Sequence, residues 1–390
     1  MLDESRIMDG KTALILEGGG CKGAFEAGII KYLHEKQIKI DLVGGTSVGG
    51  LNAACFAFGK IDELLDLWSN ISNSQVYSPG NFVQVLEALK PEELEDVKNF
   101  VIDIYQRKPG SGFSEIFDVG KDILKQTLLL PELLILSFEI ILNLIKKGSV
   151  LDNTPLRNRC AKLFDQKKVT DSVNPRLFLT AFQLQTGQDV YFGNDKNKGD
   201  LDGSVVDVLL ATSAIQGIFP VKELDGRQYI DGGNGANLPL TYAVNHDCDL
   251  ILLARDNMAA NATQNEFRNP IATTLRAYLS SFTNATARDI QWTNDISKRL
   301  GKWENDLQSL QNFSSQITDR DTQAKYLDTL KKLQPVFETD ENKRKITIFE
   351  IVPDWTPSNI IDFNSETSKR LIQDGYNKAA EVLEKQLISL

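Results

Sequence analysis

The sequence contains only two histidines among its 390 residues, His34 and His246. This scarcity excludes a metal site built from several histidines, and any Ser-His-Asp triad would have to use one of these two. His34 lies in the polar end of a predicted helix, and His246 directly precedes a predicted strand. We expect both histidines to be structural or surface residues.

Cysteine is also scarce, with four residues at Cys21, Cys55, Cys160 and Cys248. They lie far apart and form no Cys-x-x-Cys pair, which argues against a zinc site and a disulfide framework and favours a reducing compartment. The first eleven residues lack the basic and then apolar run of a secretory signal. We expect a cytoplasmic protein, with peripheral membrane association as an open alternative.

Positive charge is in deficit, because 43 lysines and arginines face 53 aspartates and glutamates, giving a formal net charge of -10. This balance argues against nucleic acid as a partner. The hydrophobic fraction of 42% and the charged fraction of 25% are typical of a soluble globular protein with a large core. The oligomeric state is left open by the sequence.

No uninterrupted apolar run is long enough to span a membrane. The longest apolar segment, 127–145 (TLLLPELLILSFEIILNLI), is interrupted by Pro131, Glu132 and Glu139. We interpret it as a buried helix. The alternative is a lid or interfacial helix that contacts lipid.

The first sixty residues predict two consecutive strand-helix units. Strands are expected at Thr12–Leu16 and Ile40–Val43, and helices at Ala24–Leu33 and Val48–Phe58. Two adjacent units of this kind indicate a parallel sheet and hence an α/β fold.

The rest of the chain adds further strands and helices. Expected elements are a hairpin from Arg176–Leu184 and Asp189–Phe192, a helix at Val205–Ala214, strands at Gln228–Ile230, Leu250–Ala254 and Lys345–Val352, and a C-terminal helix at Ser365–Leu390. We therefore divide the chain into a core over 11–255 with a helical insertion at about 61–150, a helical region over 256–345, and a returning strand and helix over 346–390 that pack on the core.

A glycine-rich loop follows the first predicted strand. Gly18, Gly20 and Gly23 match G-x-G-x-x-G between a strand and a helix, which is also the context of a dinucleotide-binding loop. However, Asp41 opens the second strand, whereas the acidic residue that holds the ribose should close it. The broader prediction is that backbone N–H groups bind an anion, either a phosphate or a transient oxyanion. Lys22 is then either a charge at the rim of this site or a solvated surface lysine.

The second strand leads into the pattern G-x-S-x-G, spelled Gly45-Thr46-Ser47-Val48-Gly49. A serine on a sharp strand-to-helix turn needs glycine two residues before and after it to avoid clashes. Ser47 is therefore a candidate nucleophile. The simpler alternative is a serine that caps the helix N-terminus.

The candidate base for this serine is Asp231, which follows a strand and opens the loop Asp231-Gly232-Gly233. The alternative is an ordinary Asp-Gly turn. An aspartate normally has a pKa of about 3.9, so burial must raise it, or tight coupling to the hydroxyl must assist it, before it can act as a base.

Taken in order, these three motifs resemble the patatin-like phospholipase family. Two further features of that family are matched by Ala211-Thr212-Ser213-Ala214 and by Phe219-Pro220. The resemblance covers roughly Lys11 to Arg255. It implies a parallel-sheet-centred α/β/α sandwich with helical insertions.

The resemblance also implies a serine esterase of phospholipase A type that uses neither metal nor cofactor. Ser47 would be the nucleophile and Asp231 the general base of a Ser-Asp dyad, acting on esters of phospholipids or other glycerolipids through an acyl-enzyme. Lys22 stands where the family usually has arginine. The implied oxyanion hole comprises Gly18, Gly19, Gly20, Cys21, Lys22 and Gly23, the elbow glycines are Gly45 and Gly49, and the base loop holds Gly232 and Gly233.

Two other functions are compatible with parts of the sequence. A nucleotide-binding oxidoreductase would use the G-x-G-x-x-G loop, and a lipid-binding protein would carry the hydrolase site as a vestige. Substitution of Ser47 by alanine separates the first alternative from a hydrolase, and labelling by a serine-directed phosphonate separates the second.

Overall fold

The computed structural model describes residues 10–79, 151–255 except residue 217, most of 287–338, 346–357 and 360–389. In chain order the principal elements are β1 (Lys11–Leu16), α1 (Gly23–Glu35), β2 (Leu42–Thr46), α2 (Val48–Ala57), α3 (Ile61–Ser69), β3 (Ser78–Pro79), β4 (Leu151–Asp152), α8 (Thr154–Phe164), β5 (Arg176–Gln183), β6 (Gln188–Phe192), α9 (Val205–Thr212), β7 (Lys222–Leu224), β8 (Arg227–Asp231), α10 (Leu240–Asn245), β9 (Cys248–Ala254), α12 (Arg320–Glu338), β10 (Thr347–Ile351) and α13 (Ser365–Ser389).

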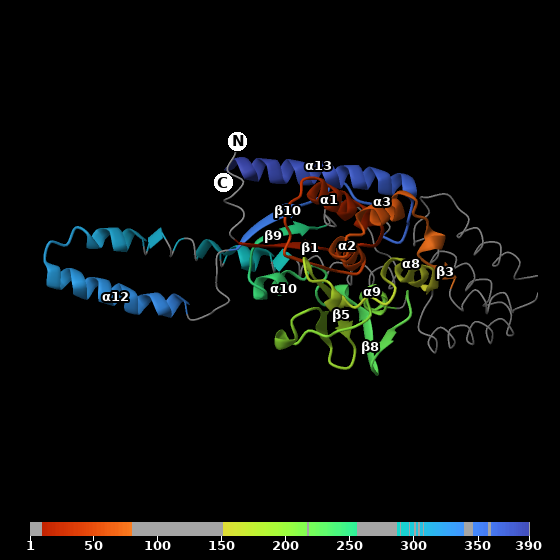
Figure 1. Cartoon of the computed structure of the whole chain (residues 1–390), viewed down its shortest axis with the longest axis horizontal. Coiled ribbons are helices and arrows are strands. Elements are labelled where there is room, and N and C mark those ends of the chain that lie inside the picture. The colour runs from red at the N-terminus through yellow and green to blue at the C-terminus, as the bar shows by residue number, and fades with distance from the viewer. Residues whose placement is uncertain are drawn as a thin grey trace, which may run out of the picture.

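Within the described residues, one eight-stranded sheet organises the molecule (Figure 1). Its order is β10-β9-β1-β2-β5-β8-β7, with β6 paired to β5. The five strands from β10 to β5 are parallel to their neighbours, and β6, β7 and β8 pair in antiparallel fashion. The predicted parallel sheet of an α/β fold is confirmed, and the predicted hairpin is formed by β5 and β6.

Strand β2 differs from its prediction, since it spans Leu42–Thr46 rather than Ile40–Val43. The prediction ended the strand at Gly44 and Gly45, because glycine weakens strands. In the folded chain the ring of Phe178 occupies the space that a Cβ on Gly44 would need. The two glycines therefore continue the strand under close packing and carry it directly to Ser47.

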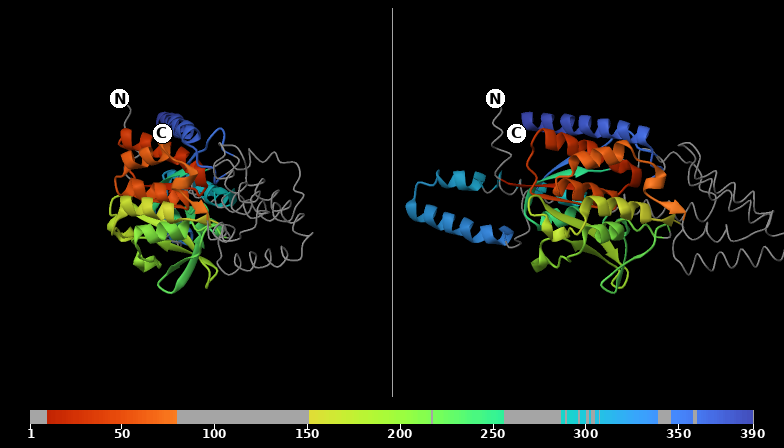
Figure 2. Two further views of the ribbon diagram at one scale, coloured as in Figure 1. Left: turned by 90° about the vertical axis from the view of Figure 1, so that its right-hand side faces the viewer. Right: turned by 45° about the vertical axis from the view of Figure 1, so that its right-hand side comes forward.

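Both faces of the sheet are apolar, as the burial of β1 shows. Leu14 and Leu16 belong to a core cluster shared with α1, α2 and α13, whereas Ala13 and Ile15 belong to a second cluster with α10. Alternate residues of a strand point to opposite faces, so one strand supplies both cores. Helices cover the sheet on both sides (Figures 1 and 2), as expected for an α/β/α sandwich.

The C-terminal helix α13 lies directly against α1 (Figure 1). A Cβ on Gly28 of α1 would overlap the carbonyl oxygen of Ile372, and a Cβ on Gly375 of α13 would overlap that of Phe25. The two helices therefore meet backbone to backbone. This close packing joins the end of the chain to the glycine-rich loop that precedes α1.

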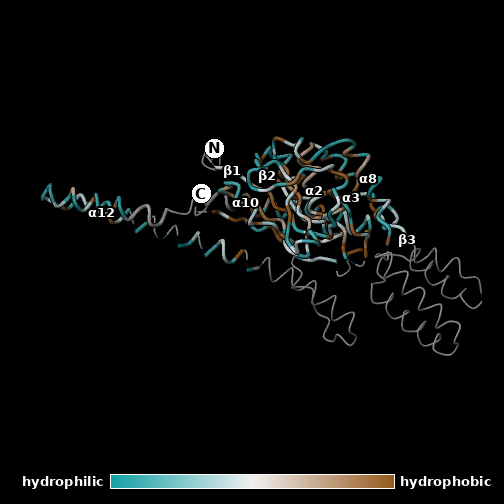
Figure 3. The backbone as a smooth tube through the Cα atoms, turned by 90° about the horizontal axis from the view of Figure 1, so that it is seen from below, coloured by the Kyte–Doolittle hydropathy of each residue, from teal (hydrophilic) through white to brown (hydrophobic). Residues whose placement is uncertain are grey.

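A helical arm containing α12 extends away from the sheet (Figures 1 and 3). Phe313 packs edge-on against Tyr326, and the Gln323 side chain donates to the Ser314 carbonyl, so the arm is held by its own contacts. At its base the Ile346 N–H donates to Ser297 Oγ at 3.1 Å, which brings the two ends of the arm together.

The predicted apolar helix 127–145 lies outside the described residues, together with most of the predicted insertion over 61–150. Among the helices in the described ranges, none combines the length and the apolar character needed to cross a bilayer.

Candidate active site

The register of three strands brings Ser47 and Asp231 together. Strand β2 runs parallel to β5 and ends with Thr46 opposite Thr180. Strand β8 runs antiparallel to β5 and ends with Asp231 opposite Ala181. The two strands thus approach each other along β5 and end at adjacent positions of it, although their final residues are far apart in sequence.

Ser47 occupies a strained turn between β2 and α2. Its backbone has φ 54° and ψ -123°, a region that side-chain-bearing residues rarely adopt. A Cβ on Gly45 would lie 2.6 Å from the Leu16 carbonyl oxygen, and one on Gly49 would lie 2.5 Å from the same atom. Both elbow glycines are therefore required by the close passage of β1, as the motif predicts.

The strained turn is held by hydroxyl groups on neighbouring elements. The Ser47 N–H donates to Thr212 Oγ1 at 2.8 Å, and the Thr212 hydroxyl donates in turn to the Thr180 carbonyl. Thr46 Oγ1 donates to the Ala236 carbonyl at 2.7 Å and so ties the elbow to the loop after Asp231. The alternative of a serine that caps the helix is not what the geometry shows, because the Ser47 side chain makes no cap hydrogen bond to α2.

The Asp231 carboxyl group is buried and hydrogen-bonded. Burial raises its pKa to about 6, against the opposing effect of hydrogen bonds from the Gly233 N–H, at 2.7 Å, and from the Ser47 side chain. A Cβ on Gly232 would clash with the Thr180 carbonyl, so the loop needs glycine to lie this close to β5. The result is a carboxylate that can accept a proton from a serine at near-neutral pH.

The glycine-rich loop lies beside Ser47, with a Cβ on Gly18 coming within 3.2 Å of the Ser47 Cβ. Three of the six residues implied as oxyanion donors have N–H groups engaged elsewhere: Gly18 donates to Asn237, Cys21 to Ile360 and Lys22 to Gly19. The Gly23 N–H closes the short helical turn of residues 20–22. Within the described part of the chain, the N–H groups of Gly19 and Gly20 have no hydrogen-bond acceptor. Of the six residues implied as oxyanion donors, these two are therefore the candidates with a free N–H group.

Two residues outside the motifs hold this loop, and sequence reasoning missed both. Asn237 accepts the Gly18 N–H on its carbonyl, while its side chain donates to the Gly18 carbonyl and to Glu17 Oε1, each at 3.1 Å. The Ile360 carbonyl accepts the Cys21 N–H at 2.8 Å. Asn237 comes six residues after Asp231, which is a weak signal at best, and no pattern around Ile360 points to the site.

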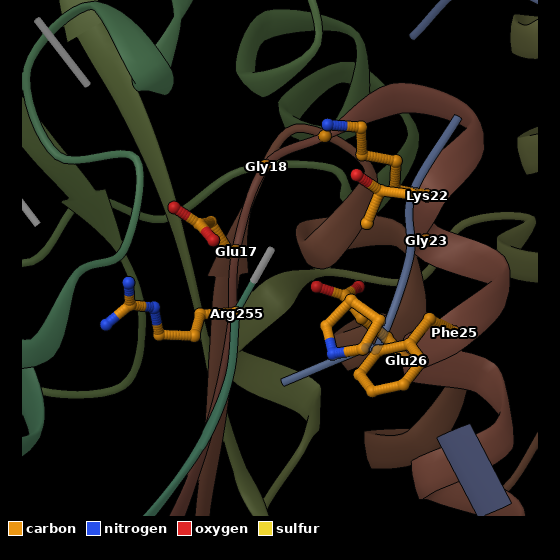
Figure 4. Close-up of a pocket in the computed structure, with 10 residues that line it drawn as sticks. Glu17, Gly18, Lys22, Gly23, Phe25, Glu26 and Arg255 are labelled. Atoms are coloured by element: carbon orange, nitrogen blue, oxygen red, sulfur yellow. The ribbon is translucent and has the colours of Figure 1, made fainter. Parts of the chain in front are cut away.

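Lys22 is buried, with 7% of its surface exposed, so the alternative of a solvated surface lysine is wrong. Together with Glu17, Glu26 and Arg255 it contributes charged groups to a small pocket of about 280 Å³ beside the loop (Figure 4). Charged side chains thus support the glycine-rich loop from the side that Ser47 does not line.

An apolar cavity of about 710 Å³ opens at Ser47. Helices α2, α3, α8 and α9 contribute to its wall, together with the segment 360–363 that leads into α13. Its lining is predominantly aliphatic and aromatic, as is typical of sites that bind apolar small molecules. The lining residues are Gly20, Ser47, Val48, Leu51, Leu67, Trp68, Ile71, Gln75, Val76, Leu156, Arg159, Cys160, Leu209, Ser213, Ile215, Phe219, Ile360, Ile361 and Phe363.

Neither histidine lies at the elbow. His34 is exposed on α1. His246 is buried at the end of α10 and stacks on Tyr242 with ring centroids 3.7 Å apart. It immediately precedes β9, so it lies at the opposite edge of the parallel strands from Ser47, which follows β2.

The positions of the acidic side chains bear on two other possible ligands, a nucleotide and a metal ion. Asp41 accepts the Thr12 N–H at the start of β1 and so lies at the far end of the strands from the glycine-rich loop, where it cannot reach a ribose bound there. Over the described ranges, histidine, cysteine, aspartate and glutamate side chains form no group of three or more that could hold a metal ion.

The motifs of this site lie within a segment that matches a known protein family. The sequence model described as Patatin-like phospholipase matches residues 14–244, more than half of the chain. The chain is similar to Lysophospholipase nte1 of Aspergillus terreus, with 44% identity over 52 residues, or 13% of this chain and 3% of the relative. It shows the same identity over 54 residues to human Patatin-like phospholipase domain-containing protein 6, covering 14% of this chain and 4% of that protein.

The chain thus spans only a few per cent of the length of these two relatives. Among solved structures, that of VipD from Legionella pneumophila matches with a TM-score of 0.40 and 14% identity, covering 97% of this chain and 67% of that one.

Proposed function

The chain belongs to the patatin-like phospholipase family, and from this premise we propose that it is a lipid acyl hydrolase that cleaves carboxylic esters of phospholipids or other glycerolipids. The observation that carries the proposal is the meeting of the Ser47 side chain with the buried Asp231 carboxyl group, whose pKa it lowers, beside an apolar cavity that Ser47 lines. A hydroxyl, a base and an apolar space for the acyl chain are what ester cleavage in a lipid requires.

In the first half of the proposed reaction, Ser47 Oγ attacks the ester carbonyl carbon while its proton passes to the Asp231 carboxylate. The negative charge moves to the carbonyl oxygen, where the N–H groups of Gly19 and Gly20 would donate to it. The tetrahedral intermediate then collapses, the bond to the alcohol oxygen breaks, and Asp231 returns its proton to that oxygen. The acyl group remains on Ser47 as an ester.

In the second half, water attacks the acyl-enzyme carbonyl and gives a proton to Asp231. Collapse of the second intermediate breaks the bond to Ser47 Oγ, which takes the proton back, and the fatty acid leaves. The near-neutral pKa of Asp231, about 6, suits both directions of transfer, because the group can accept and release a proton near physiological pH.

The alternative of a nucleotide-binding oxidoreductase finds no support in the loop geometry. A pyrophosphate needs several free N–H groups at the helix N-terminus, whereas those of Gly18, Cys21 and Lys22 donate within the protein. The Ile360 carbonyl also occupies the space next to Gly20 that a bound nucleotide would approach.

The proposed function is tested by fatty-acid release from a panel of phospholipids and glycerides. The wild-type chain should release fatty acid, and Ser47→Ala and Asp231→Asn should each reduce the rate about 10³-fold or more. Labelling of the wild type, but not of Ser47→Ala, by a serine-directed phosphonate tests the acyl-enzyme separately. Equal release by all three proteins would refute the dyad, and failure of the wild type to label would support a vestigial site.

A further inference from the structure

A single charged side chain, Arg159, lines the apolar cavity in the described part of the chain. It projects from α8, where Leu156, three residues earlier on the same helical face, and the adjacent Cys160 also line the cavity. Cys160 is fully buried, whereas Arg159 is half-buried. The guanidinium group therefore lies where the apolar cavity meets the surface.

Among the residues that the structure describes, this arginine has no ionic partner that would explain its position. No hydrogen bond or ion pair joins it to another residue within the described ranges; the nearest acidic influence is Asp66 of α3. Asp66 is exposed, and its Oδ1 already accepts a hydrogen bond from the Asn70 side chain at 2.7 Å. Partial burial lowers the pKa of Arg159, chiefly by desolvation, so the protein keeps a cation at a site that disfavours it.

We propose that Arg159 binds the phosphate of a phospholipid whose ester carbonyl lies at Ser47, so that phospholipids rather than neutral glycerides are the preferred substrates. This inference rests on the proposed function. A guanidinium group donates two parallel hydrogen bonds to phosphate oxygens, and an apolar surrounding strengthens such charge-assisted bonds. A diacylglycerol offers no anionic group to pair with Arg159, whereas its acyl chains would fill the same apolar cavity.

The kinetic test compares two substrates that differ only in the phosphate, dihexanoyl phosphatidate and dihexanoylglycerol. Arg159→Gln should lower kcat/KM for the phosphatidate about tenfold to 100-fold and leave that for the glyceride within twofold. Arg159→Lys should recover part of the loss, because it restores the charge without the two-pronged geometry. The matched control is Arg157→Gln, since Arg157 is exposed on the same helix and does not line the cavity.

A binding test decides the same point without catalysis. In the Ser47→Ala background, calorimetry should show tighter binding of the phosphatidate than of the glyceride, and Arg159→Gln should remove the difference. Inorganic phosphate at millimolar concentration should not compete, because it lacks acyl chains. Competition by phosphate would instead indicate a site for free phosphate, and an Arg159-dependent affinity for decanoate alone would indicate a site for the fatty-acid carboxylate; either result overturns the proposal.

The two experiments also separate this inference from the proposed function. A wild-type chain that cleaves neither lipid would refute the hydrolase, while the calorimetric comparison would still decide whether Arg159 recognises a lipid phosphate. Equal losses on both substrates in Arg159→Gln, or no loss on either, would refute the role of Arg159 and leave the hydrolase intact.

Discussion

At the residue scale, the site combines two arrangements that cost folding free energy. Ser47 has a positive φ without being glycine, and Asp231 is a carboxyl group buried at 6% exposure. Strain of the first kind costs of order 1–3 kcal/mol. Such costs persist at functional positions because the chemistry needs them, so changes at these residues should affect activity and stability in opposite directions.

The pH dependence of hydrolysis should follow Asp231. Its pKa is raised to about 6, and only the carboxylate can accept the serine proton, so activity should fall about tenfold per pH unit below 6 and level off above about 7. The measurement is kcat/KM on a soluble short-chain ester between pH 4.5 and 8.5. His34→Gln and His246→Gln should keep the same midpoint; a midpoint that moves with either histidine would contradict the assignment.

Asp231→Asn should stabilise the inactive protein at pH 8. Because the folded-state pKa is above the ordinary value of 3.8, the folded protein binds the proton more tightly, and stability falls as pH rises from about 4 to about 6. At pH 8 the penalty is complete and amounts to at most about 3 kcal/mol, since each tenfold change in proton affinity is about 1.4 kcal/mol. Urea unfolding at pH 8 and pH 4 should show a gain only at the higher pH.

Two replacements of Ser47 should differ in stability while both abolish activity. Glycine adopts φ near +54° without strain, whereas alanine keeps the Cβ that disfavours it. The free energy of unfolding of Ser47→Gly should therefore exceed that of Ser47→Ala by about 1 kcal/mol. The glycine variant should accordingly unfold at a higher temperature. The reverse order in thermal unfolding would mean that the elbow is not strained in solution.

At the element scale, the candidate active site depends on a segment outside the family match. Residues 14–244 contain the motifs, yet the segment 360–363 supplies part of the cavity wall and the carbonyl that accepts the Cys21 N–H. Phe363 stacks on Trp68 with ring centroids 6.3 Å apart, and its N–H donates to Asn73 Oδ1 at 2.7 Å. The connection between β10 and α13 is therefore a structural part of the site.

Shortening a side chain of this segment should change the preference for acyl length. Phe363→Ala would enlarge the apolar cavity, so the ratio of kcat/KM for long-chain to short-chain esters should rise severalfold. The ratio is informative even if the variant is less stable, because destabilisation lowers both rates together. Phe313→Ala in the helical arm, where the ring is 51% exposed, is the control and should leave the ratio unchanged.

At the scale of the whole molecule, the helical arm that contains α12 extends from a sheet whose two faces are covered. The two ends of the arm meet at its base. Ile290 packs in the second core cluster and Ser297 contacts Ile346, whereas Leu310, Phe313 and Leu327 beyond them are exposed. Figure 3 shows the arm as mainly hydrophilic and separate from the apolar centre of the molecule. The arm is thus held by local contacts and adds little to the core.

Replacement of residues 302–343 by a six-residue Gly-Ser linker should leave the sheet and the site intact. The two ends already meet through the Ser297–Ile346 hydrogen bond, so a short linker can close the gap at small entropic cost. Hydrolysis of a soluble short-chain ester should remain within about threefold of wild type, with cooperative unfolding retained. Loss of both activity and cooperative unfolding would show that the arm is part of the folding unit.

Much of the fold was predictable because its signals are local. Apolar runs bounded by glycines mark the strands, and the predicted α/β class with a parallel sheet is confirmed. The main error in the first strands came at β2, where glycine was taken as the end of a strand although Phe178 requires it there. The domain boundaries at 255 and 345 remain predictions.

The sequence by itself determined the chemistry available at the site: a serine between two glycines, an aspartate before two more, and too few histidines for the usual base. Only the tertiary structure decided how those groups lie relative to one another. Two strands that end at neighbouring positions of β5 bring Ser47 next to Asp231. The carbonyl groups of Asn237 and Ile360 accept the N–H groups of Gly18 and Cys21, whereas the N–H groups of Gly19 and Gly20 have no acceptor in the described part of the chain. The physical reason is that strand register and burial depend on contacts between residues far apart in the chain, which no local pattern records.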